Sequence, residues 1–146
     1  MKVPNLSKVF TWRACNNILP AKDNLKRRGI VDEELYIFCC QEREMVNHIL
    51  WACPLAQNVW GTSNHKLKKC KRSYSDFMEL FEELLVLLNG EDLNLFALTS
   101  RGIWQRRNSV VHGGVFTHPN IVAYMDREDL LWYTGKYSYA KPGSQR

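Results

Sequence analysis

The stretch CCQEREMVNHILWACP, residues 39–54, places Cys39, His48 and Cys53 at the spacing Cys-x8-His-x4-Cys. Thiolate and imidazole groups are the ligands that Zn²⁺ takes in tetrahedral sites. On one straight α-helix His48 and Cys53 would point about 140° apart, but Pro54 breaks the helix and lets Cys53 swing back toward His48. A turn after Cys39 can likewise fold that residue over the start of the helix. The spacing therefore predicts a zinc site with three ligands.

The position three residues before Cys39 decides whether this site has a fourth ligand. A four-ligand site would have another cysteine there, at Cys-x2-Cys spacing, but the residue is Tyr36. A phenol is a poor zinc ligand, and Cys40 can bind the same ion as its neighbour Cys39 only with strain. In the alternative interpretation, Cys39 and Cys53 are small buried hydrophobic residues and His48 is an ordinary helix residue. The residues alone leave both interpretations open.

The composition is typical of a globular protein in a reducing compartment. The chain has 146 residues, 45% of them hydrophobic and 24% charged, which is enough for one domain with a core. Its five cysteines are an odd number and include an adjacent pair, which does not suit a disulfide framework. Residues 1–17 lack the pattern of a secretory signal, and no run approaches the roughly 20 apolar residues of a membrane span. We therefore expect an intracellular protein, in the nucleus or cytoplasm, that is not secreted and has no membrane partner.

Hydrophobic spacing and turn residues predict a mainly α fold. We expect a small helical domain with a short zinc-knuckle-like hairpin or turn and two longer C-terminal helices. The predicted helices cover residues 3–13, 21–28, 44–52, 54–60, 75–88 and 92–112, with a partly β-like run at 35–38 and a loop at 61–73. Gly29 is expected to cap the second helix, and Ser75 to cap an amphipathic helix whose apolar face includes Leu85. Arg106 and Arg107 are expected close to the end of the last helix, as cations that favour its dipole.

Several stretches of the first 61 residues resemble a known family. They are WRA (12–14), ILP (18–20), NLKRRGI (24–30) and HILWACP (48–54). Together they resemble the zinc-binding domain that follows the polymerase in plant LINE-type (non-LTR) retrotransposon reverse transcriptases. In that family the pattern is Cys-x2-Cys-x8-His-x4-Cys, so the resemblance implies Zn²⁺ with ligands at Cys39, His48 and Cys53 only. Tyr36 replaces the first cysteine of the pattern, which leaves the ligand set incomplete.

The resemblance also implies a division of the chain. It places a reverse-transcriptase zinc-binding-like domain at residues 2–61. The charge and the apolar spacing of the residues add a basic loop at 62–74, a helical linker region at 75–114 and a tail without an assigned role at 115–146. A looser likeness extends to residues 103–108. The resemblance implies no catalytic residue, because the polymerase and ribonuclease H carboxylates of such polyproteins belong to neighbouring domains. We therefore do not expect an enzyme.

Three functional hypotheses follow. The first is a non-catalytic zinc-binding accessory module derived from a retroelement reverse-transcriptase polyprotein, with no small-molecule substrate. The net charge of +5 permits an RNA or DNA partner without requiring one, and the candidate contacts are Lys66, Lys68, Lys69, Lys71 and Arg72. The second is a metal-free, degenerate helical scaffold or interaction domain, in which Tyr36 marks the loss of the zinc site. The third is a hydrolase with a three-ligand catalytic zinc and Glu42 or Glu44 as base.

Overall fold

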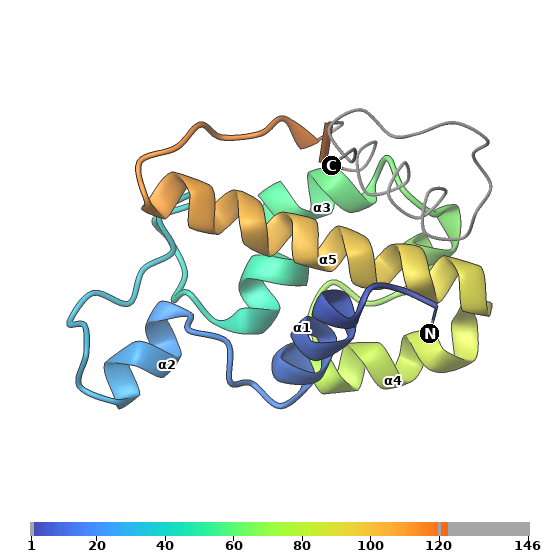
Figure 1. The fold of residues 1–146 in the computed structure, drawn as a ribbon, viewed down its shortest axis with the longest axis horizontal. Helices are drawn as coiled ribbons and strands as arrows, with labels where there is room; N and C mark the ends of the chain where they lie inside the picture. The colour runs from blue at the N-terminus through green and yellow to red at the C-terminus, as the bar shows by residue number, and fades with distance from the viewer. Residues whose placement is uncertain (1, 120, 123–146) are drawn as a thin grey trace, which may run out of the picture.

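The computed structural model describes residues 2–119, 121 and 122, and this part of the chain is mainly helical, as the sequence predicts (Figure 1). Its elements are α1 (Asn5–Cys15), α2 (Lys22–Arg27), the π-helical turn η1 (His48–Ala52), α3 (Pro54–Trp60), the 3₁₀ helix η2 (His65–Lys69), α4 (Phe77–Leu87) and α5 (Gly90–Val111). Within the described residues, no helix is both long enough and apolar enough to span a bilayer. Residues 123–146, most of the predicted tail, lie outside the described part.

Helix α5 is the centre of the arrangement. It packs against α1 and η1, while α1 also packs against α4 and η1 against α3. In Figure 1, α1 and α4 lie on one side of α5 and α3 lies on the other. Aromatic rings fill the middle of the core: Trp60 stacks on Phe96 with ring centroids 4.7 Å apart, and Phe77 stacks on Phe96 at 6.0 Å. One hydrophobic cluster therefore joins residues from both the 2–61 and the 75–114 ranges. The predicted division into domains stays a prediction.

Helix α2 ends at the glycine cap that the sequence predicts. Gly29 has φ +74°, a backbone conformation that other residues adopt only with strain. The amide of Ile30 donates to the Leu25 carbonyl at 2.9 Å, and the amide of Gly29 donates to the Lys26 carbonyl at 2.9 Å. This is the paired hydrogen-bond pattern of a Schellman motif. It turns the chain out of α2 toward the segment that carries Cys39.

The boundaries of the two long helices differ from the prediction. Asp76, not Ser75, caps α4, and its carboxylate accepts the amide of Glu79 at 2.9 Å. Asn89, which follows the predicted helix 75–88, is the N-cap of α5, so α5 begins at Gly90, two residues before the predicted start at residue 92. Both errors have the same cause, because adjacent residues of cap-forming type cannot be ranked without the backbone geometry. Leu85 is 54% exposed, so its placement on the apolar face was wrong.

The two arginines near the end of α5 are buried, which the prediction that they interact with the helix dipole did not anticipate. Arg106 is 3% exposed and Arg107 is 6% exposed. Arg107 pairs with the fully buried carboxylate of Glu44, and its Nε lies 3.1 Å from Glu44 Oε2. Glu44 also accepts the amide of Lys22 at 2.8 Å. A buried charge is tolerated only when it is paired and hydrogen-bonded, so this ion pair ties the chain before η1 to α5.

The segment predicted as a basic loop is not irregular throughout, because it contains η2. It is also anchored to the helices beneath it. The indole of Trp51 donates to the Lys71 carbonyl at 3.0 Å, and the side-chain amide of Asn47 donates to the Tyr74 carbonyl at 2.9 Å. The segment is thus fixed against the turn that carries His48.

Candidate metal centre

Cys39 lies at the tip of a short hairpin, as the predicted knuckle-like turn requires. Leu35 and Arg43 form an isolated antiparallel bridge, and the amide of Tyr36 donates to the Glu42 carbonyl at 2.8 Å. The expected β-like run at residues 35–38 is thereby reduced to one bridge residue followed by a turn. Cys40 takes φ +54° in this turn. The hairpin brings Cys39 back over the start of η1.

His48 and Cys53 are connected by a π-helical turn, where the sequence predicts an α-helix. The amide of Cys53 donates to the His48 carbonyl at 2.9 Å, an i→i−5 bond. A π turn holds an extra residue, so two residues five apart come to lie nearly above one another instead of about 140° apart. Pro54 then begins α3, as predicted. The two residues therefore converge through a widened turn as well as through the break at Pro54.

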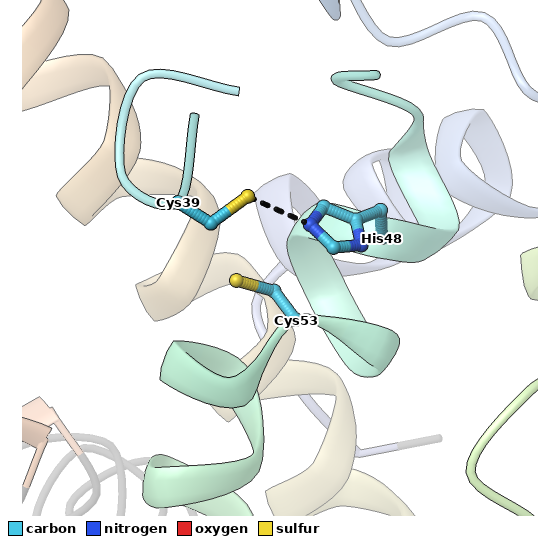
Figure 2. Close-up of side chains that lie close together, drawn as sticks. All are labelled: Cys39, His48 and Cys53. Carbon is cyan, nitrogen blue, oxygen red and sulfur yellow. Dashed lines mark hydrogen bonds between the residues drawn. The ribbon is translucent and has the colours of Figure 1, made fainter. Parts of the chain in front are cut away.

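The three predicted ligands lie together. Cys39 Sγ is 3.4 Å from His48 Nε2, and the two sulfur atoms and the nearest imidazole nitrogen all lie within 4.8 Å of one another (Figure 2). A tetrahedral zinc ion with these ligands would hold them roughly 3.5–3.8 Å apart. The donors thus need to shift by about 1 Å at most to fit such an ion. The cluster can hold a metal, although its ligand set is incomplete. Its donors come from the hairpin (Cys39), from η1 (His48) and from the position just before α3 (Cys53).

Burial shifts the pKa values of two members of the cluster, Cys53 and His48. It raises the pKa of the Cys53 thiol, against the effect of the Leu55 and Ala56 backbone N–H groups at the start of α3. It also lowers the pKa of His48. The imidazole is therefore neutral near pH 7 and its nitrogen can donate electrons to a metal. A metal ion would displace the proton of the thiol, so its binding weakens as the pH falls.

The position of a fourth protein ligand is taken by Tyr36, which is 1% exposed. Its ring stands perpendicular to the ring of His48, with centroids 5.6 Å apart. Burial raises the pKa of the Tyr36 phenol above its usual value, and the nearby Cys53 adds to this. Cys40 does not replace it, because its thiol is exposed and donates to the Ile37 carbonyl at 3.3 Å. Among the His, Cys, Asp and Glu side chains of the described residues, the cluster has three members.

The two glutamates proposed as a catalytic base lie in different places. Glu44 is fully buried, and its carboxylate accepts hydrogen bonds from Arg107 and from the amide of Lys22. It therefore has no free access to a ligand at the cluster. Glu42 is exposed and lines a cleft of about 610 Å³ that also includes His48. The structure brings neither carboxylate into the group of metal donors.

Arg106 borders the cluster, although nothing in the sequence indicated it. Its Nη2 donates to the Leu55 carbonyl at 3.3 Å, two residues after Cys53. Its guanidinium lies 5.9 Å from the ring centroid of Phe38, the neighbour of Cys39, and 4.6 Å from that of Phe116. Burial lowers the pKa of Arg106, while Tyr36 and Cys53 oppose that effect. A buried cation thus contacts both segments that carry the cysteines.

The five predicted nucleic-acid contacts differ in their surroundings. Lys66 pairs with Asp92 at 3.2 Å. Lys71 pairs with Glu79 at 3.4 Å and lies 5.0 Å from the centroid of the Tyr74 ring. The other three predicted contacts are exposed and form no ion pair with any described residue; they are Lys68, Lys69 and Arg72.

Comparison with known proteins gave one family. The comparison with curated proteins and the comparison with solved structures found no match. Residues 1–60, which hold the hairpin, η1 and α3 together with all three donors, match the family described as zinc-binding in reverse transcriptase. This match supports a reverse-transcriptase zinc-binding domain in the N-terminal part of the chain.

Proposed function

We propose that the chain is a non-catalytic, zinc-binding accessory module derived from the reverse-transcriptase polyprotein of a retroelement, of the plant LINE type. The observation that carries this proposal is the convergence of Cys39, His48 and Cys53 from separate parts of the segment that matches the family. The family is an accessory zinc-binding domain and not the polymerase domain. We therefore assign the cluster a structural role.

The role of the donors is to fasten the hairpin to η1. In the structure, a contact of 3.4 Å between Cys39 and His48 joins the two segments at the cluster. When bound, zinc would supply strong thiolate and imidazole bonds, and its binding free energy would add to the free energy of folding. Cys53, fully buried at the start of α3, would extend the same link to a third segment. One ion would thus hold three short segments that have few backbone hydrogen bonds to one another.

Metal content after purification in reducing buffer tests this proposal. We expect substoichiometric zinc for the unmodified chain, and close to one ion for Tyr36→Cys, which restores the fourth ligand of the family pattern. Cys53→Ser should lose the metal, because it removes a thiolate from the cluster. Cys70→Ser, which alters a half-buried cysteine outside the cluster, is the matched control and should keep it. Negligible metal in both the unmodified chain and Tyr36→Cys contradicts the zinc-binding function.

A metal-free scaffold is the second candidate function, and the continuity of the core favours it. The hydrophobic cluster extends from Phe10 in α1 to Trp104 in α5, and the ion pair of Glu44 and Arg107 adds a polar link. These contacts need no metal. If this candidate is correct, chelation will leave the melting temperature unchanged. The zinc-binding module instead predicts a clear decrease on chelation.

Contact with RNA or DNA is a further part of the proposal. Its support is the group formed by Lys68, Lys69 and Arg72, which are exposed and carry no ion pair among the described residues. Three phosphate contacts would give a salt dependence of log K against log[salt] with a slope of about −2 for a single strand or −3 for a duplex. Replacing all three with alanine should abolish most of this slope. A slope that does not change with the triple substitution would exclude this surface.

A further inference from the structure

Arg106 is a buried cation that forms no ion pair within the part of the chain that the structure describes. Its side chain is 3% exposed, and no carboxylate of the described residues pairs with it. Two carbonyls, those of Leu55 and Thr117, accept from its Nη atoms, and its Nε has no hydrogen-bond partner. A guanidinium cannot lose its proton in a protein, so its burial needs a nearby negative charge. Among the described residues, the side chains of Tyr36 and Cys53 interact electrostatically with it and favour its charged form.

A zinc ion with the three donors does not supply that charge. The two thiolates of Cys39 and Cys53 cancel the charge of the dication, and the imidazole of His48 is neutral. The centre is then neutral and Arg106 stays unbalanced. A third thiolate at position 36, as in the family pattern, would make the centre a monoanion and balance the arginine. Because residue 36 is a tyrosine instead of a cysteine, the centre lacks both its fourth ligand and the negative charge that this ligand would carry.

A surface cleft lies beside the cluster, on the side of His48. It has a volume of about 610 Å³, and its lining includes His48, Ala52 and Pro54, which flank the turn between the donors. Arg43, Arg72 and Glu42 also line it, so its wall carries two positive charges and one negative charge. Because Cys39 and His48 are both half-buried, the cluster is not closed off from solvent, and a small anion can approach it.

We propose that the fourth coordination position of the metal centre binds a small monovalent anion from solution, and that Arg106 is the positioning residue that favours it. This inference rests on the proposed zinc-binding function. A neutral fourth ligand such as water would fill the coordination shell but leave the buried guanidinium without a counter-charge. An anion meets both requirements.

Cobalt(II) and azide test this inference on the full chain. Cobalt(II) reports thiolate ligation through a charge-transfer absorption, and its visible bands respond to a change in the fourth ligand. We expect the thiolate band on adding cobalt, and then a saturable change of the visible bands on adding azide. If the thiolate band does not form, the proposed metal site fails. If the band forms but azide leaves the visible spectrum unchanged, only the present inference is overturned.

Substitutions separate the role of Arg106 from a general effect of an open site. Arg106→Met should weaken azide binding by about tenfold to a hundredfold, the range typical of residues that support metal ligands. Arg106→Lys, which keeps the charge, should restore most of it. Arg101→Met is the matched control, because Arg101 is half-buried on the same helix and has no ion pair among the described residues. Equal azide affinity in Arg106→Met and the unmodified chain would refute the assignment.

Two more measurements exclude a purely structural role. Removing an unbalanced buried charge should leave the stability of the metal-free protein unchanged or increase it, whereas a structural role predicts a decrease. Tyr36→Cys should bind cobalt but lose its response to azide, because the third thiolate fills the position and balances Arg106. A full azide response in Tyr36→Cys would contradict the proposal. This variant also decides the question if Arg106→Met fails to fold.

Discussion

The ion pair between Glu44 and Arg107 gives the sharpest prediction about stability. Arg107→Met keeps most of the side-chain volume but leaves the fully buried carboxylate of Glu44 without its cation. Breaking one partner of a buried ion pair costs about 3–5 kcal/mol of unfolding free energy. For a chain of this size that corresponds to a decrease in melting temperature of roughly 10–20 °C. Because the pair joins residues 63 positions apart, the loss should appear in the cooperative unfolding of the whole described core.

Denaturant unfolding of a double-mutant cycle measures this effect. Glu44→Gln removes the charge but keeps an oxygen that can accept the amide of Lys22, a bond of 2.8 Å in the structure. The double variant Glu44→Gln, Arg107→Met should therefore be more stable than Arg107→Met alone, because no unpaired charge is left. Arg101→Met again serves as the control and should change the unfolding free energy by less than about 0.5 kcal/mol. If Arg107→Met costs less than about 1 kcal/mol, Glu44 does not depend on its partner and the reasoning is refuted.

Three further predictions concern other parts of the fold. Asp76→Ala should lower the unfolding free energy by about 1 kcal/mol, because it removes the cap of α4. Thermal unfolding measures this loss, and Ser75→Ala should lose clearly less stability. Equal losses in the two variants would contradict the assigned cap. Gly29→Ala should cost about 1–2 kcal/mol, because only the backbone at φ +74° opposes the new methyl group and no atom lies within 4 Å of it. Burial, with the charges of Asp76 and Glu82, raises the pKa of the Cys15 thiol to about 11 from an ordinary value of 9.0. Between these two pH values the unfolded state loses the thiol proton while the folded state keeps it. The unfolding free energy should therefore fall as the pH rises from 9 to 11. Unfolding free energies at pH 8, 9 and 10 in reducing buffer check this, and Cys15→Ala should show a smaller decrease; an identical decrease in both would exclude the thiol as a cause.

The local pattern of the sequence was sufficient for much of the fold. The apolar spacing between Phe77 and Leu84 predicts an amphipathic helix, and Gly29 marks the end of α2, because both signals depend only on neighbours in the chain. The proximity of Cys39, His48 and Cys53 could also be expected, since the chain between them is short and contains a turn and a proline. The role of these residues as metal ligands stays a prediction.

The sequence could not indicate features that depend on distant partners. Charged residues are exposed by default, and nothing near Arg106 and Arg107 in the sequence indicated that they are buried. Their burial depends on segments about 50 to 60 residues earlier. For the same reason, the pairing of Lys66 with Asp92 could not be foreseen. The residues of the π-helical turn after His48 are also found in α-helical turns, so the composition does not distinguish the two conformations. The wider turn, which holds one extra residue, depends on the packing around it.

That π-helical turn makes the approach of the two donors depend on the conformation of the turn between them. The four residues between His48 and Cys53 form a single widened ring closed by one amide, and three of them are buried in the core. An ordinary α-helical turn of the same length would leave the histidine and the cysteine about 140° apart, whereas deleting one residue would put them four positions apart, on one face of an α-helix. Conservative exchanges of apolar residues here should be tolerated as long as the widened turn is kept. The chain thus retains a less regular helix where a more regular one would separate the two donors.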